Sequence, residues 1–146
     1  MAAWRAFLTA HARVTGLLED ELENERSLPL SWYDVLLQLK EAPDDRLRMS
    51  DLAGAVLLSK SGLTRLVDRM CAAGLTARSA DVEDRRGRWV SLTPEGRARL
   101  RKAAPVHLRG VAEHFTSQLS EDEARMLAAA LSGIAERAAE RERRSG

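Results

Sequence analysis

The feature that most constrains this chain is the stretch from Met49 to Gly96, in which two short helical patterns are followed by two strand patterns. The first helix is expected over residues 51–56. Ser50 is its expected N-cap, because a serine side chain there can accept a hydrogen bond from the first helical turn. Residues 57–59 then form a turn, and two short helices joined in this way are typical of a helix-turn-helix.

The second helix of this pair is expected to run from Lys60 to about Ala73, with Ser59 as its N-cap and Gly74 at its end. Apolar residues recur on one face at helical spacing: Leu63, Leu66, Val67 and Met70. The other face is polar and carries Lys60, Ser61, Thr64, Arg65, Asp68 and Arg69. Such a helix fits the major groove of DNA, where arginine can bind a guanine edge. An ordinary amphipathic helix has the same pattern, so this helix alone does not decide the function.

Two strands, over residues 75–80 and 89–92, flank a charged hairpin tip in which Gly87 can adopt a positive φ. The tip carries three arginines, Arg85, Arg86 and Arg88, and their mutual repulsion is offset by Asp81, Glu83 and Asp84. We expect Asp84 to orient Arg86, and Arg86 to enter the minor groove, where the negative potential is enhanced. A ribbon of this kind directly after a helix-turn-helix is a wing.

Three segments in this order carry a resemblance to a known family. They are Gly74-Leu75-Thr76-Ala77-Arg78, Asp81-x-x-Asp84-Arg85-Arg86-Gly87 and Val90-Ser91-Leu92-Thr93-Pro94-x-Gly96. With these spacings the chain resembles the winged helix-turn-helix signature of the MarR (multiple antibiotic resistance regulator) family. The resemblance implies a mainly α fold with a small β wing. It also implies one compact domain with an N-terminal dimerisation helix (1–30), a winged helix-turn-helix DNA-binding module (31–100) and C-terminal dimerisation helices (101–146).

Both ends of the chain are expected to be amphipathic helices. The first covers residues 2 to about 27 and carries the stripe Trp4, Phe7, Leu8, His11, Val14, Leu18 and Leu22. The last opens on a capping box of Ser120 and Glu123, carries the stripe Leu127, Leu131, Ile134 and Ala138, and is expected to fray over residues 136–144. The resemblance implies that these stripes pair two copies of the chain, with Trp4, Phe7, Leu8, His11, Leu127, Leu131 and Ile134 at the dimer interface.

Prolines and capping residues divide the rest of the chain. Ser31 is expected to cap a second helix that ends before Pro43, and residues 47–49 are expected to form a third strand beside the wing. Thr93-Pro94-Glu95 predicts the start of a long helix, in which Pro105 predicts a kink.

The distribution of charge indicates a nucleic-acid partner, although the net charge of +1 does not. Residues 44–101 hold twelve Lys or Arg against eight Asp or Glu, whereas the remainder holds eleven against fourteen. The basic excess therefore lies in the segment expected to meet DNA. The single cysteine, Cys71, excludes an intramolecular disulfide and fits a reducing compartment. Because no apolar run has the length of a membrane span and no signal peptide is visible, we expect a cytoplasmic protein with no membrane partner.

Catalytic motifs are missing from the sequence. We find no phosphate-cradling glycine loop, no zinc-ligand spacing and no nucleophile elbow. The histidines His11, His107 and His114 have no serine or cysteine partner at a recognisable spacing. We therefore expect neither an enzyme, nor a cofactor, nor a metal site.

These patterns predict a sequence-specific DNA-binding transcriptional regulator, a repressor, that binds a pseudo-palindromic operator as a homodimer, with half-sites ~10 bp apart. Base contacts are assigned to Ser61, Thr64 and Arg65, phosphate contacts to Lys60, Arg69 and Arg78, and the minor groove to Arg86. Ser59, Arg85 and Arg88 complete the expected DNA-binding set. The resemblance also implies release by a small aromatic or other organic effector, for which His11 and Trp32 are the expected pocket residues.

Two alternatives stay open. One is a winged-helix protein-interaction module that does not read DNA, for which an arginine-rich wing would be unnecessary. The other is a redox-responsive regulator that uses Cys71. That residue lies near the end of the second helix of the pair (60–73), the predicted recognition helix, where a small buried apolar role is the simpler interpretation. His11 is expected as a hydrogen-bonded core or interface histidine, with an effector contact as its alternative role.

Overall fold

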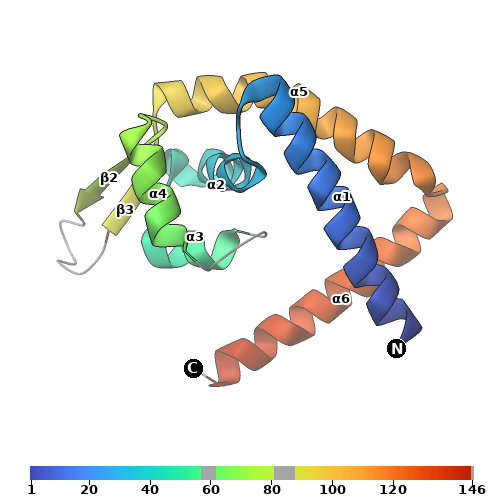
Figure 1. The fold of residues 1–146 in the computed structure, drawn as a ribbon. Helices are drawn as coiled ribbons and strands as arrows, with labels where there is room; N and C mark the ends of the chain where they lie inside the picture. Colours follow the sequence, from blue (N-terminus) through green and yellow to red (C-terminus); the bar gives the residue numbers. More distant parts are fainter. Residues whose placement is uncertain (57–61, 81–87, 146) are drawn as a thin grey trace.

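The computed structural model describes residues 1–56, 62–80 and 88–145, and it has the expected mainly helical architecture with a small sheet (Figure 1). The helices are α1 (Ala2–Arg26), α2 (Leu30–Glu41), α3 (Met49–Ala55), α4 (Leu63–Ala72), α5 (Pro94–His114) and α6 (Glu121–Ser145). Short 3-10 turns lie at Pro43–Asp45 (η1) and Thr116–Gln118 (η2). The strands are β1 (Arg46–Arg48), β2 (Thr76–Ala80) and β3 (Arg88–Leu92), arranged antiparallel in the order β1-β3-β2.

The hydrophobic core lies between α2 and the elements that surround it. Leu36 and Leu39 of α2 are fully buried, as are Val67 of α4, Val90 of β3 and Leu22 of α1. Burial of such a side chain contributes about 1.5–3 kcal/mol. The core therefore joins the end of α1, the helix-turn-helix and the sheet into one packed unit, as the apolar spacing of each segment predicts.

Two predicted helix caps are wrong. Helix α2 begins at Leu30, so Ser31 lies inside it, and the amide of Leu30 donates to the Glu19 carboxylate at 2.9 Å. Pro29 therefore stands at the N-cap, and a side chain from α1 satisfies the first amide of the helix. Helix α3 begins at Met49 because β1 leads directly into it through Arg48, so Ser50 lies within the helix and not at its cap.

Two other predicted helix starts are confirmed. The Thr93 hydroxyl accepts a hydrogen bond from the amide of Gly96 at 3.0 Å, with Pro94 at the first helical position of α5. At α6, the amide of Ser120 donates to Glu123 at 2.9 Å and the Glu123 amide donates to Ser120 Oγ at 3.4 Å. The bonds from Ser120 lower the pKa of the Glu123 carboxyl. Both caps use residues three positions apart, which is why the sequence pattern revealed them.

The start of the predicted recognition helix needs a correction. Gly62 has a φ of 73°, which is left-handed, so an α-helix cannot run through it from Lys60 and α4 begins at Leu63. Residues 57–61, including the proposed contacts Ser59, Lys60 and Ser61, lie outside the described residues.

The predicted end of this helix is confirmed. The amide of Leu75 donates to Met70 O at 3.0 Å, and the amide of Gly74 donates to Cys71 O at 2.9 Å. Gly74 has a φ of 74°, as expected for a glycine that ends a helix.

The outer helices are long and continuous. Helix α5 carries Pro105 without interruption, so the expected kink does not break it, and Figure 1 shows its second half descending toward α6. Helix α6 continues to Ser145, so the expected fraying over residues 136–144 is not seen. The N-terminal half of α1 leads away from the sheet and helices α2–α4, and α6 crosses α1 in the view and runs back below them to the C-terminus (Figure 1). Among the described residues, no helix combines the length and apolar character needed to cross a membrane.

Gly96 allows α5 to start against the wing. A Cβ at this position would overlap the carbonyl oxygen of Leu75 and lie 2.9 Å from Leu92 Cδ1. We therefore expect Gly96→Ala to lower the free energy of unfolding by ~1–3 kcal/mol, as overpacking does elsewhere. Gly54→Ala on α3, where a Cβ would meet no atom within 4 Å, is the control and should gain ~0.5–1 kcal/mol. Equilibrium urea unfolding measures both, and a Gly96→Ala protein as stable as the wild type would contradict the close approach.

Candidate nucleic-acid interface

Helix α4 separates its residues by polarity as the sequence predicts. Leu63, Leu66, Val67 and Met70 are buried against the core, whereas Thr64, Arg65, Asp68 and Arg69 are exposed. The buried face fixes the orientation of the helix, and the exposed face presents hydrogen-bond donors and positive charge to the solvent. This arrangement suits insertion of a helix into the major groove.

Arg78 of β2 binds the recognition helix directly. One of its guanidinium nitrogens donates to the carbonyl oxygen of Thr64 at 3.1 Å and lies 3.0 Å from a carboxylate oxygen of Asp68. From the sequence we predicted that Arg78 contacts a DNA phosphate. In the structure its guanidinium group instead binds Thr64 and Asp68 of α4. Asp68 is the residue that sequence reasoning missed here, because its partner lies on a strand ten positions further along and no short pattern joins the two.

The wing is described as far as its two strands. Ala80 pairs with Arg88 at the open end of the ribbon, and Arg88 is exposed there. The tip, residues 81–87, lies outside the described residues, and so do the expected contacts Asp84, Arg85 and Arg86.

The edge strand β1 adds two arginines that the predicted DNA-binding set does not include. The guanidinium groups of Arg46 and Arg48 lie 4.7 and 5.5 Å from the centre of the Trp89 ring on β3. Arg48 is the register partner of Trp89. A cation over an aromatic face contributes roughly 0.5–1 kcal/mol at an exposed site. The alternation of Arg46, Leu47 and Arg48, which places both arginines on one face of a strand, was the signal available in the sequence.

Asp45 holds the turn before β1 against two helices. Its carboxylate binds Lys40 of α2 at 3.1 Å and also binds Arg97 of α5. Hydrogen bonds from Lys40 and then Arg97 lower the pKa of this carboxyl. The edge strand is thereby fixed to the helices on either side.

The two expected effector residues occupy different environments. The ring of His11 lies 6.2 Å from that of Phe7 on the exposed part of α1, whereas Trp32 of α2 is partly buried against the core. Sequence reasoning missed a neighbouring aromatic pair, in which the rings of Tyr33 and His107 are 4.4 Å apart. Burial raises the pKa of Tyr33, with a smaller contribution from Glu41, and burial lowers the pKa of His107 against the opposing charge of Asp34.

Cys71 is half-buried at the end of α4. Its sulfur lies 3.3 Å from the hydroxyl of Thr76 and it packs against the core. This setting fits the small packing residue that the sequence predicts.

Known proteins share both the sequence pattern and the fold of this chain. A model of the MarR family matches residues 27–87. AbsC, a MarR family transcriptional regulator from Streptomyces coelicolor, is 39% identical with a TM-score of 0.85, and the match covers 93% of this chain and 91% of AbsC. The chain belongs to the MarR family of transcriptional regulators. The family consists of regulators and not of enzymes, as expected.

Two further transcriptional regulators are similar to this chain. Sco3205, a MarR family regulator from Streptomyces coelicolor solved in complex with DNA, is 30% identical with a TM-score of 0.86, and the match covers 92% of this chain and 85% of Sco3205. The HTH-type transcriptional repressor YetL of Bacillus subtilis is 30% identical over 105 residues. That match spans 70% of this chain and 63% of YetL, so it covers less than two thirds of the repressor.

The contact between Arg78 and Asp68 predicts a measurable coupling between strand β2 of the wing and helix α4. Because the Arg78 side chain is about a quarter exposed and that of Asp68 more than half, we expect a double-mutant cycle to give ~0.3–1 kcal/mol of interaction energy. The cycle uses Asp68→Asn, Arg78→Gln and the double variant in urea unfolding. The more exposed pair Asp122 and Arg125 on α6 is the comparison, and its coupling should lie at the low end, at about 0.2–0.5 kcal/mol. Strict additivity at Asp68 and Arg78 would contradict the contact.

Proposed function

We propose that this MarR family regulator is a sequence-specific repressor that binds a pseudo-palindromic operator as a homodimer in the cytoplasm. The observation that carries the proposal is helix α4, whose apolar face is locked in the core while Thr64, Arg65 and Arg69 face the solvent. The DNA complex of Sco3205, at 30% identity, supports the same use of the fold.

The proposed DNA contacts divide by chemistry. Thr64 and Arg65 read base edges, because they lie on the exposed face near the start of α4. Ser61, which is outside the described residues, is proposed to read base edges with them. Arg69 and Lys60 bind phosphates. Arg86, oriented by Asp84, enters the minor groove. The proposed DNA-binding set also includes Ser59, Arg85 and Arg88. Arg78 acts chiefly by holding α4 through Thr64 and Asp68. In this division residues 31–100 meet the DNA, and residues 1–30 and 101–146 join the two copies.

The exposed apolar surface supports the homodimer. On α1, Trp4, Phe7 and Leu8 are 58%, 42% and 45% exposed, and on α6 Ile134 is 58% exposed. An apolar surface of this extent on one chain marks an interaction site. A second copy covers it in the proposal, with Leu127 and Leu131 of α6 and His11 of α1 in the same interface.

A small aromatic or other organic effector is the third part of the proposal. His11 and Trp32 line its pocket, and a ligand that changed the spacing of the two recognition helices would weaken binding, because both half-sites must be engaged at once. Calorimetry with phenolic and other aromatic acids tests for such a ligand. The solvent-facing arginines of α4 disfavour the competing protein-interaction function. The half-buried setting of Cys71 disfavours redox regulation.

Arg65 and Arg69 should differ in the kind of affinity they supply. We expect Arg65→Ala to cost ~1–3 kcal/mol and to relax the preference at one base pair, because arginine reads a guanine edge. Arg69→Ala should weaken binding to all sequences alike and lower the salt slope by about one, since it removes one phosphate contact. Fluorescence anisotropy on an operator selected from random duplexes, and on single-base variants of it, measures both.

The start of α6 is well separated from α4 (Figure 1), so Arg125→Ala in α6 is the control and should retain the wild-type affinity. If Arg65→Ala weakened all sequences equally, the assignment of Arg65 to a base would be wrong. A wild-type protein that bound no duplex would overturn the proposed function itself.

The dimer proposal has its own test. Ile134→Glu places a charge in the middle of the exposed apolar face of α6, so we expect the homodimer to dissociate into single chains at micromolar concentration. Ser132→Glu, two positions earlier and therefore on another side of the helix, should remain dimeric. Light scattering after size-exclusion chromatography gives the mass, and a wild-type mass of one chain would contradict the proposal.

A further inference from the structure

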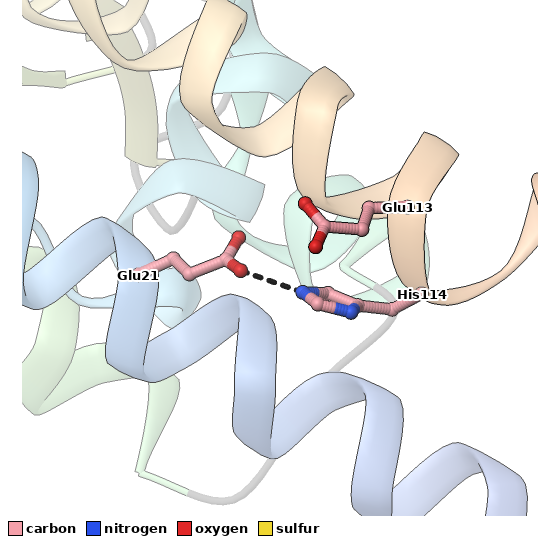
Figure 2. Close-up of side chains that lie close together, drawn as sticks. All are labelled: Glu21, Glu113 and His114. Carbon is pink, nitrogen blue, oxygen red and sulfur yellow. Dashed lines mark hydrogen bonds and ion pairs between the residues drawn. The ribbon is translucent and has the colours of Figure 1, made fainter.

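Three side chains with metal-ligating groups converge where α1 crosses α5. Glu21 lies on α1, Glu113 and His114 lie at the end of α5, and their ligand atoms are all within 4.8 Å of one another. Figure 2 shows the Glu21 carboxylate pointing across the seam toward His114, with Glu113 beside it. His114 Nε2 lies 2.6 Å from Glu21 Oε1.

The packing of the two helices holds Glu21 in this position. Gly110 lies one turn before His114, and a Cβ there would overlap the second carboxylate oxygen of Glu21 and lie 2.6 Å from Leu18 Cδ2. The missing side chain therefore lets α1 approach α5 closely. Glu21 Oε2 is buried and has no hydrogen-bond partner among the described residues. A buried carboxylate oxygen in this state normally has a cation or a donor as its partner.

The neighbouring charges leave the cluster negative. Arg109, the cation one turn away on α5, is paired with Glu25 of α1. Two carboxylates this close repel each other, and an imidazole supplies a neutral nitrogen ligand when it is deprotonated. One nitrogen and two carboxylate oxygens form a donor set that suits Zn²⁺ and related divalent transition metals, whereas Mg²⁺ and Ca²⁺ prefer oxygen ligands throughout.

We propose that Glu21, Glu113 and His114 form a binding site for a divalent transition-metal ion, with Zn²⁺ as the best-matched ion. The bound ion joins α1 to the C-terminal end of α5, immediately before the η2 turn that leads to α6. It would therefore fix the terminal helices relative to one another. The site depends on side chains of one chain, so metal binding can be measured without DNA and independently of the proposed repressor function.

Competition with a chromophoric chelator tests this site in the full-length protein, with ZnCl₂ as the probe. We expect one Zn²⁺ per chain, and a loss of affinity of roughly tenfold or more in both Glu113→Gln and His114→Gln, because each removes a ligand. Glu23→Gln, an exposed carboxylate on α1, is the matched control and should bind as the wild type does. Co²⁺ should give visible d–d absorption in the wild type that both ligand variants lose.

Folding is checked separately. Because Glu113 is exposed, Glu113→Gln should keep the wild-type circular dichroism and unfolding midpoint in EDTA, so that its loss of affinity reports the missing ligand. At the same concentration, Zn²⁺ should raise the midpoint of the wild type more than that of His114→Gln. Absence of saturable binding, or equal affinity in the wild type and both ligand variants, would overturn the proposal. An equal loss of affinity in the Glu23→Gln control would also overturn it, because binding would then be to general surface charge.

Discussion

Thr93 joins the recognition helix, the wing and the long helix α5 through one residue. Its hydroxyl donates to Gly74 O at 2.6 Å and accepts from the amide of Gly96 at 3.0 Å, and its own amide donates to Leu75 O at 3.2 Å. The end of α4 and the start of α5 are thus fixed at one point. DNA reading by a helix requires that its angle to the rest of the protein be constant, and this junction sets that angle together with the buried face of α4.

A series of polar contacts joins α1 to α5 along the seam between them. Arg26 donates to the carbonyl of Lys102 at 3.0 Å, Arg99 donates to that of Ser27 at 2.8 Å, and ion pairs of Glu25 and Glu21 continue the seam toward the end of α5. Polar contacts of this kind are individually weak in water. Leu18 of α1 is also buried in this seam, against Gly110 of α5, so the polar contacts supplement a close apolar packing that resists small displacements.

The elements predicted correctly are those whose causes lie within a few residues. The apolar spacing of α4, the Schellman end at Gly74, the Thr93 cap and the capping box at Ser120 each need only a short window of sequence. The errors at Ser31 and Ser50 have the opposite cause. Leu30 finds its acceptor in Glu19 of another helix, and α3 continues directly from β1, so the local serine is not needed at either start. The predicted start of α4 was also wrong, because Gly62 has a left-handed backbone and the helix begins after it, at Leu63.

The sequence by itself determined the family, the helical architecture and the side of α4 that faces the solvent, because periodicity and turn residues are local properties of a chain. Only the tertiary structure showed that Arg78 binds Thr64 and Asp68, that Trp89 lies beneath two arginines, and that Glu21 meets Glu113 and His114. Glu21 and His114 are 93 positions apart and meet only where two helices cross. No spacing rule covers such a pair, because the crossing is set by packing of whole helices and by the missing side chain of Gly110.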